Sequence, residues 1–171
     1  MKIIEKKSRT DYVIYTAIIL GGILLDQLTK WLCAKYLAPL GESVPIIKGV
    51  LQLTYVENTG AAFGILKNHR WVFLLISTLA VLGMNLFLYF GHAPTRLSGI
   101  ALSMIISGGI GNMIDRSVLG YVVDFIDFCL IDFAVFNGAD SFVCVGCGIL
   151  ILAILIMPPE KKKEEKNDAQ S

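Results

Sequence analysis

Asp, Glu, Lys and Arg are missing from four long stretches of this chain, although they make up 17% of its 171 residues. The stretches cover residues 12–25, 71–90, 97–114 and 141–157. An apolar helix of about 20 residues crosses a bilayer, and the second stretch has this length, whereas the others reach it with their flanks. Because 55% of the residues are hydrophobic and the mean hydropathy is +0.67, little sequence remains for a separate soluble domain. The sequence therefore predicts one integral membrane domain over residues 1–171, of the all-α class with four transmembrane helices.

Histidine is scarce, with two residues in the whole chain. Four membrane crossings place His69 and His92 on opposite sides, so a His-containing metal cluster or a Ser–His–Asp triad is poorly supported. Four cysteines in a membrane-embedded chain do not indicate a disulfide framework. Cys144 and Cys147 have the spacing of a redox or zinc motif, but they lie within the last apolar stretch without a second pair, so we expect small buried packing residues. We expect neither a metal nor an organic cofactor.

Basic residues gather close to the first and last apolar stretches. They are Lys2, Lys6, Lys7 and Arg9 on one side and Lys161, Lys162, Lys163 and Lys166 on the other. Basic flanks stay on the cytoplasmic side of a membrane, so both termini are expected in the cytoplasm. The resulting topology has helices near residues 12–32, 70–90, 97–116 and 139–157, an outer loop over 34–69, and a cytoplasmic basic tail over 160–171.

The outer loop contains a stretch with strand character. Residues 50–56 are rich in β-branched and aromatic side chains with partial alternation, which predicts a strand and a small extracytoplasmic sheet on the membrane surface. The turn-rich residues 57–64 follow, and Gly60 and Gly64 permit backbone geometry or close approach that a side chain would block. Taken alone, such a segment is more often a re-entry turn than a binding element.

Four ionisable residues lie at the ends of the apolar stretches: Asp26, Asp115, Arg116 and Asp140. The topology places all of these ends at the outer boundary, and charge in this setting indicates a functional site by default. Small residues recur every four positions beside two of the acids, as Gly99, Ser103, Ser107 and Gly111 before Asp115, and as Cys144 and Gly148 after Asp140. Such stripes let membrane helices approach closely, so ordinary packing is the alternative for either helix alone. Two stripes that both end in an acid favour a site.

Two carboxyl groups that share one proton can activate a water molecule. The ionised group removes a proton from the water while the protonated group polarises a peptide carbonyl, as in aspartic proteases. Asp140 follows the expected helix cap Asn137, so the helix dipole favours its ionised form. Asp124 lies in the apolar run 121–125, where desolvation favours the protonated form. Asp127 has almost the same local context as Asp124, and spacing does not decide between them.

Motifs from the first to the fourth helix resemble those of one family. They are DQLTK at 26–30, ENTGAAFG at 57–64, GNMIDR at 111–116 followed by GYVVDF at 120–125, and FNGAD at 136–140. The series is similar to that of bacterial lipoprotein signal peptidase, also called signal peptidase II. Short motifs in membrane helices are individually weak, but this series in order over most of the chain is specific.

The resemblance implies an intramembrane aspartic endopeptidase that cleaves diacylglyceryl-modified prolipoproteins just before the lipidated cysteine. It implies that Asp124 and Asp140 are the catalytic pair. The supporting residues that it implies are Asn58, Asn112, Arg116 and Asn137 at the substrate or the pair, with Asp26, Lys30 and Asp115 bracing the site. It further implies the bacterial cytoplasmic membrane, an active site near the outer leaflet, and binding of membrane lipid and globomycin-type inhibitors, with no nucleic acid partner.

The sequence departs from the family pattern at the start of the fourth helix. Gly138 stands where the family usually has a larger apolar residue. Residues 129–133 also lack the tryptophan that family members often have before the Phe-Asn motif. Two other classes of protein also fit parts of the pattern. A proton-coupled transporter would place its acids near the midplane with access from both sides. A structural protein would use the small-residue stripes and would not require the carboxyl groups of Asp124 and Asp140.

Overall fold

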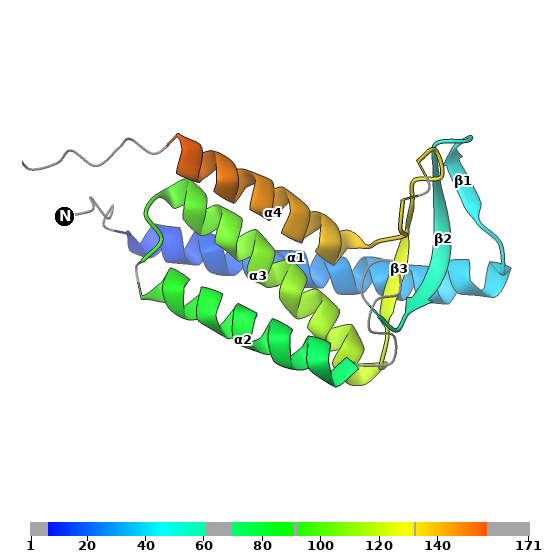
Figure 1. Cartoon of the computed structure of the whole chain (residues 1–171), viewed down its shortest axis with the longest axis horizontal. Coiled ribbons are helices and arrows are strands. Elements are labelled where there is room, and N and C mark those ends of the chain that lie inside the picture. The colour runs from blue at the N-terminus through cyan, green and yellow to red at the C-terminus, as the bar shows by residue number, and fades with distance from the viewer. Residues whose placement is uncertain (1–6, 61–69, 91, 132, 157–171) are drawn as a thin grey trace, which may run out of the picture.

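The computed structural model describes residues 7–60, 70–90, 92–131 and 133–156. These residues form four long helices and a three-stranded sheet (Figure 1). The helices are α1 (Arg9–Leu32), α2 (Arg70–Tyr89), α3 (Arg96–Val118) and α4 (Gly138–Leu155), and the strands are β1 (Val44–Ile47), β2 (Leu51–Asn58) and β3 (Val122–Asp127). All four helices belong to segments long and apolar enough to cross a membrane. The predicted fold class, a helical membrane protein with a small β-containing region, is confirmed.

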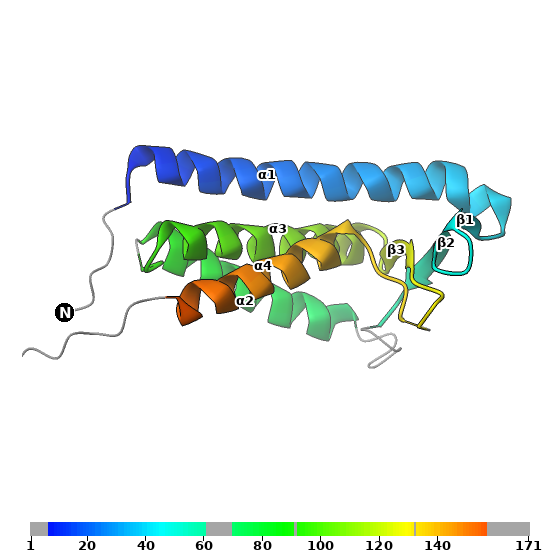
Figure 2. The ribbon, with the colours of Figure 1, turned by 90° about the horizontal axis from the view of Figure 1, so that it is seen from above.

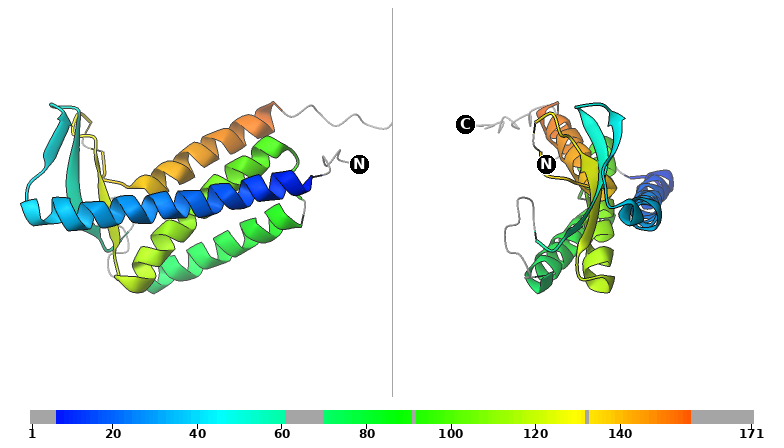
Figure 3. Two further views of the ribbon diagram at one scale, coloured as in Figure 1. Left: turned by 180° about the vertical axis from the view of Figure 1, so that it is seen from behind. Right: turned by 90° about the vertical axis from the view of Figure 1, so that its right-hand side faces the viewer.

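Helix α3 is the centre of the bundle. It packs against α1, α2 and α4, and the end-on view shows the other helices arranged around it (Figure 3). The core that joins α1, α2 and α3 contains Tyr15, Ile19, Leu88, Leu102 and Ile106. Large apolar side chains elsewhere on the helices are exposed, as expected for a protein whose solvent is lipid. Residues on α3 can therefore contact partners on each of the other helices.

The small residues of α3 lie against α1. Gly99 faces the ring of Tyr15 on α1. Ser107 lies beside Gly22 of α1, and a side chain at Gly22 would collide with the Ser107 hydroxyl. The Ser107 hydroxyl donates to the Ile19 carbonyl at 3.2 Å. Helices α1 and α3 are therefore packed closely, as small residues at this spacing allow.

The expected packing stripe on α4 is wrong. Cys144 is exposed, and among the described residues no atom of another element lies within 4 Å of the position that a Gly148 Cβ would occupy. Helix α4 instead uses Gly146, which lies against the backbone of Ala101 on α3. The prediction that Cys144 and Cys147 are buried is also wrong, since both are exposed. The sequence periodicity identified small residues, but it did not identify which side of α4 faces α3.

Helical structure continues beyond the expected end of the first helix. A π-helical turn (Cys33–Leu37) and a 3-10 turn (Ala38–Leu40) extend α1 into the region expected to be loop. The extension ends at Gly41, whose φ of +67° is a left-handed conformation that favours glycine. Figure 2 shows that α1 and this extension run past the other helices to the sheet.

The sheet covers one end of the bundle. Strand β2 is central and pairs antiparallel with both β1 and β3, and Ile126 of β3 also bridges to Phe136 before α4. Leu37 from the α1 extension packs with Val123 and Phe125 of β3. The strand predicted over residues 50–56 is present as β2. The opposite end of the bundle holds the start of α1 and the end of α4 (Figure 1).

Candidate active site

Asp124 is the buried acid of β3, with 2% of its surface exposed. Its Oδ2 accepts a hydrogen bond from Asn58 Nδ2 at 2.8 Å, and its Oδ1 accepts one from Asn137 Nδ2 at 2.6 Å. Burial raises the pKa of Asp124 to about 6, although the Asn58 bond lowers it, and the nearby charge of Asp140 adds to the increase. Asp124 therefore keeps its proton to a higher pH than an ordinary aspartate.

Asp140 lies in the first turn of α4 and belongs to the cap of that helix. Asn137 is the N-cap, as expected, and its Oδ1 accepts from the Asp140 backbone N–H at 3.0 Å. In return, Asp140 Oδ2 accepts from the Asn137 backbone N–H at 3.2 Å. Its Oδ1 accepts from Asn112 Nδ2 at 2.8 Å. The Asp140 carboxylate therefore accepts hydrogen bonds from two donors and lies at the N-terminal end of the helix.

Two asparagines connect the acids. Asn137 Nδ2, which donates to Asp124, also donates to Asn112 Oδ1 at 3.1 Å, and Asn112 donates to Asp140. Asn137 is fully buried. Asp124 and Asp140 are therefore held by one continuous hydrogen-bond network, although they come from different elements of the fold.

Both acids line a cavity of about 530 Å³. Its lining consists of Asn58, Phe73, Ser77, Asn112, Arg116, Val122, Asp124, Phe133, Ala134, Val135, Phe136, Asp140, Ser141 and Cys144. Polar groups from β2, β3, α3 and α4 thus meet apolar side chains from α2, α4 and the segment before α4. Such a cavity can take an apolar ligand and present a polar bond to the acids.

Asp127 is directed elsewhere. Its Oδ2 accepts from Gln52 Nε2 at 2.7 Å and from Thr54 Oγ1 at 2.8 Å, both on β2. Residues three apart in a strand lie on opposite faces, so Asp124 and Asp127 cannot both face the cavity from β3. The two acids have similar neighbours in sequence, and the strand separates them in space.

Arg116 lies at the cavity beside the Asn58 turn. Its Nη1 donates to the Asn112 carbonyl at 3.4 Å, and its Nη2 donates to the Gly60 carbonyl at 3.2 Å. Its guanidinium also stacks on Phe73 of α2, 5.0 Å from the ring centroid. The Gly60 backbone N–H donates to Asn58 Oδ1 at 2.9 Å, which orients the amide that binds Asp124. Gly64 and His69 lie outside the described residues, as does the tail over 160–171.

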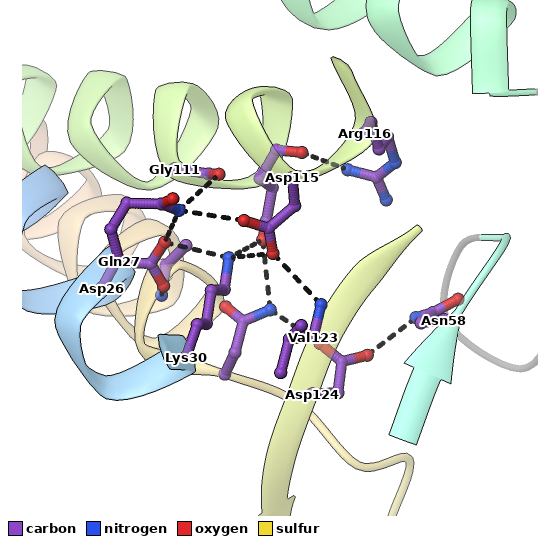
Figure 4. A network of polar contacts seen from close by, with 12 residues as sticks. Asp26, Gln27, Lys30, Asn58, Gly111, Asp115, Arg116, Val123 and Asp124 are labelled. Carbon is purple, nitrogen blue, oxygen red and sulfur yellow. Dashed lines mark hydrogen bonds and ion pairs between the residues drawn. The ribbon is translucent and has the colours of Figure 1, made fainter. Parts of the chain in front are cut away.

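Next to the cavity is a buried ionic cluster (Figure 4). Lys30 Nζ lies 2.9 Å from Asp26 Oδ2 and 3.0 Å from Asp115 Oδ2. Gln27 Nε2 donates to Asp115 Oδ1 at 2.9 Å and to Asp26 Oδ2 at 3.2 Å. The sequence predicted the three charged residues but not Gln27. Its position beside Asp26, in a helix turn that also contains Lys30, was the available signal.

Four membrane helices, with buried carboxyl groups beside a largely apolar cavity at one end, define a multi-pass membrane enzyme. A family model described as signal peptidase (SPase) II matches residues 18–156. The chain therefore belongs to the signal peptidase II family of proteases, and the resemblance seen in its motifs is confirmed.

Similar proteins support the same assignment. The lipoprotein signal peptidase of Brevibacillus brevis is 47% identical over 146 residues, which is 85% of this chain and 95% of that protein. The lipoprotein signal peptidase of Caldanaerobacter subterraneus is 53% identical over 129 residues, which is 75% of this chain and 86% of that protein. A solved structure described as a bacterial membrane enzyme is 32% identical, with a TM-score of 0.75 over 86% of this chain and 94% of the other.

Proposed function

We propose that this protease removes signal peptides from diacylglyceryl-modified prolipoproteins by cleaving before the lipidated cysteine, with Asp124 and Asp140 as its catalytic pair. One observation carries the assignment: among the described residues that line the cavity, the acids are Asp124 and Asp140. Asp127, which spacing alone left as an alternative before the resemblance favoured Asp124, bonds to Gln52 and Thr54 on β2.

In the proposed reaction the two acids have different roles. Asp140, surrounded by donors, begins as the carboxylate and takes a proton from water as the water oxygen bonds to the scissile carbonyl carbon. Asp124 gives its proton to the carbonyl oxygen and so stabilises the tetrahedral intermediate. When the C–N bond breaks, the proton held by Asp140 passes to the leaving amine, while Asp124 recovers its proton from a hydroxyl of the intermediate. The products are a carboxylic acid and an amine, and the pair returns to its starting state.

The neighbouring polar residues support these roles. Asn58 and Asn137 donate to Asp124, and Asn112 donates to Asp140, so each orients a carboxyl group. Arg116 lines the same cavity, and its guanidinium carries five N–H donors in a fixed plane. A peptide bond can be cleaved only after its segment leaves helical geometry, which frees carbonyl groups for such donors. We assign Arg116 to the substrate backbone on the signal-peptide side of the scissile bond.

The apolar lining supports a lipidated substrate. Phe73 comes from α2, Cys144 from α4, and Phe133 and Val135 from the segment before α4. A signal peptide is an apolar helix within the bilayer, and the acyl chains of the modified cysteine are also apolar. Both can enter from the membrane between α2 and α4 while the scissile bond meets the acids. A globomycin-type cyclic peptide would occupy the same cavity.

The proposed location is the bacterial cytoplasmic membrane, with both termini in the cytoplasm and the active site near the outer leaflet. In support, Arg9 begins α1 at the end of the bundle where α4 finishes, and the sheet and the cavity are at the other end (Figure 1). Lys7 and Arg9 lie at the first of these ends, and basic residues there agree with cytoplasmic placement.

The test is cleavage of a purified prolipoprotein with and without its diacylglyceryl group, with mass spectrometry of both products. We expect cleavage of the modified form, one product beginning with the lipidated cysteine, and little cleavage of the unmodified form. Equal cleavage of both forms, or a different new N-terminus, would overturn the proposed specificity.

A further inference from the structure

Two acids outside the cavity each bind the backbone next to one of the proposed catalytic aspartates. Asp115 Oδ2 accepts from the Val123 backbone N–H at 3.1 Å, and Val123 directly precedes Asp124. Asp26 Oδ1 accepts from the Ala139 backbone N–H at 2.9 Å, and Ala139 directly precedes Asp140. Each acid therefore holds the chain at the residue before a catalytic group.

Lys30 joins these two attachments. Its ammonium lies 2.9 Å from Asp26 Oδ2 and 3.0 Å from Asp115 Oδ2, and it donates to Asn112 Oδ1 at 2.9 Å. An ammonium group has three N–H donors and no acceptor, so these three oxygens match its full capacity. Lys30 is 3% exposed, which means that water does not compete for these donors.

Lys30 also fixes the direction of the hydrogen bonds between the acids. Because an ammonium only donates, Asn112 must turn Oδ1 towards Lys30, and its Nδ2 then donates to Asp140. The same Oδ1 accepts from Asn137 Nδ2, which also donates to Asp124. Lys30 therefore determines which way the Asn112 amide faces. This direction fits that of Asn137, whose Oδ1 accepts from the Asp140 backbone N–H.

We propose that Lys30 is a positioning residue, which sets the separation of Asp124 and Asp140 through Asp115 and Asp26 and sets their hydrogen-bond donors through Asn112. The proposal rests on the catalytic pair assigned above. A buried ionic cluster is an expensive way to stabilise a fold, since well-packed apolar residues of similar size often serve as well or better. A positioning role explains why the carboxylates of Asp26 and Asp115 accept hydrogen bonds from the backbone next to the proposed catalytic acids.

The test compares three variants with the wild-type enzyme, each purified in detergent and checked for folding by thermal unfolding. Lys30→Met removes the ammonium and keeps most of the side-chain volume. The triple variant Asp26→Asn, Lys30→Met and Asp115→Asn also neutralises the two carboxylates, so that no buried acid of the cluster lacks its cation. Lys35→Met is the matched control, because Lys35 lies in the π-helical extension of α1 and stacks on Trp31 and Tyr36.

We expect Lys30→Met and the triple variant to lose about 100-fold in kcat, as misplacement by about 1 Å can cost, while KM changes little. The pH profile of kcat/KM should move as well. The charges of Lys30 on α1, Arg116 on α3 and Asp140 on α4 all act on the Asp124 carboxyl group. Loss of the lysine charge raises the pKa of Asp124, so the alkaline limb should move to higher pH. Lys35→Met should match wild type in both measurements.

A wild-type kcat in either folded Lys30 variant would overturn the proposal. A loss of activity in proportion to the loss of folded protein, with an unchanged pH profile, would also overturn it. If Lys30→Met does not fold, the triple variant decides between these results. An Asp124→Asn variant in the same assay tests the pair separately: if it retains cleavage, the proposed function fails whatever the Lys30 variants do.

Discussion

At the scale of residues, two aspartates acquire different chemistry from their surroundings. Asp124 lies on a buried strand and receives amide donors from Asn58 and Asn137. Asp140 lies in the first turn of a helix and accepts hydrogen bonds from the Asn137 backbone N–H and from Asn112. A pair of acids in which one holds a proton and the other does not is what water activation requires.

The first prediction concerns pH. The active pair carries one proton, placed on Asp124, so kcat/KM of the wild type should fall as pH rises through the Asp124 pKa of about 6. Asn58 lowers that pKa through its hydrogen bond, and Asn58→Ala should therefore move the alkaline limb upward by about one unit. The measurement is kcat/KM for a diacylglyceryl-modified peptide across the pH range.

Gln52→Ala is the matched control for this prediction, because Gln52 lies on the same strand and donates to Asp127 instead. Its pH profile should coincide with that of the wild type. A downward shift for Asn58→Ala, or equal shifts for both variants, would contradict the assigned proton.

A second prediction uses two cysteines on α4. Both cysteines are exposed, but Cys144 lines the cavity one helical turn beyond Asp140, whereas Cys147 is not among the described lining residues. Cys144→Phe should fill part of the cavity and reduce kcat/KM by about tenfold or more, mainly through KM, since lost substrate contact is lost binding. Cys147→Phe adds the same group to the same helix and should leave kcat/KM nearly unchanged. Equal effects of the two changes would show that the apolar end does not hold substrate.

At the scale of elements, the sequence was informative where the physics is local. Charge-free stretches determine membrane helices, and the cap at Asn137 follows from side-chain chemistry within one helical turn. Strand β3, which carries Asp124, was not predicted, because its pairing with β2 joins residues far apart in the chain. The same limit kept spacing from deciding between Asp124 and Asp127. The family resemblance implied Asp124, and the strand places the two acids on opposite faces.

Packing between elements was predicted less well. The α3 stripe does lie against α1, but α4 turns a different side to α3 than its spacing of small residues suggested. The helical extension to Leu40 was not predicted, since residues 34–40 were assigned to the outer loop. These outcomes depend on the fit of distant surfaces, which a single sequence does not report.

The third prediction concerns the first turn of α4. A side chain at Gly138 would make ordinary contact, with its Cβ 3.6 Å from Asp26 Oδ1. Gly138→Ala should therefore raise the free energy of unfolding by about 0.5 kcal/mol, since alanine has less freedom to lose on folding. Thermal unfolding in detergent measures this change.

Gly108→Ala serves as the contrasting variant. Its Cβ would collide with the backbone carbonyl of Ala139, and overpacking of this kind costs about 1–3 kcal/mol. It should also displace the start of α4 and lower cleavage. The account of this helix contact would be wrong if Gly108→Ala were as stable as Gly138→Ala.

At the scale of the whole molecule, the site exists only in the assembled chain. Lys30 comes from α1, Asn58 from β2, Asn112 from α3, Asp124 from β3 and Asp140 from α4. The sheet and the α1 extension cover the end of the bundle at which these residues meet (Figures 1 and 2). The membrane helices can thus hold an apolar substrate while the covered end limits water around the scissile bond.

The central claim is that Asp124 and Asp140 together cleave the lipidated substrate, and the most direct measurement is single-turnover cleavage by folded Asp124→Asn, Asp140→Asn and Asp127→Asn variants. Each change replaces a carboxyl group by an amide of nearly equal size, so packing is retained and acid–base chemistry is lost. We predict that the first two variants bind the diacylglyceryl-modified prolipoprotein without cleaving it, and that Asp127→Asn cleaves it at a rate close to that of the wild type. Cleavage by folded Asp124→Asn or Asp140→Asn, or its loss in Asp127→Asn alone, would contradict the account.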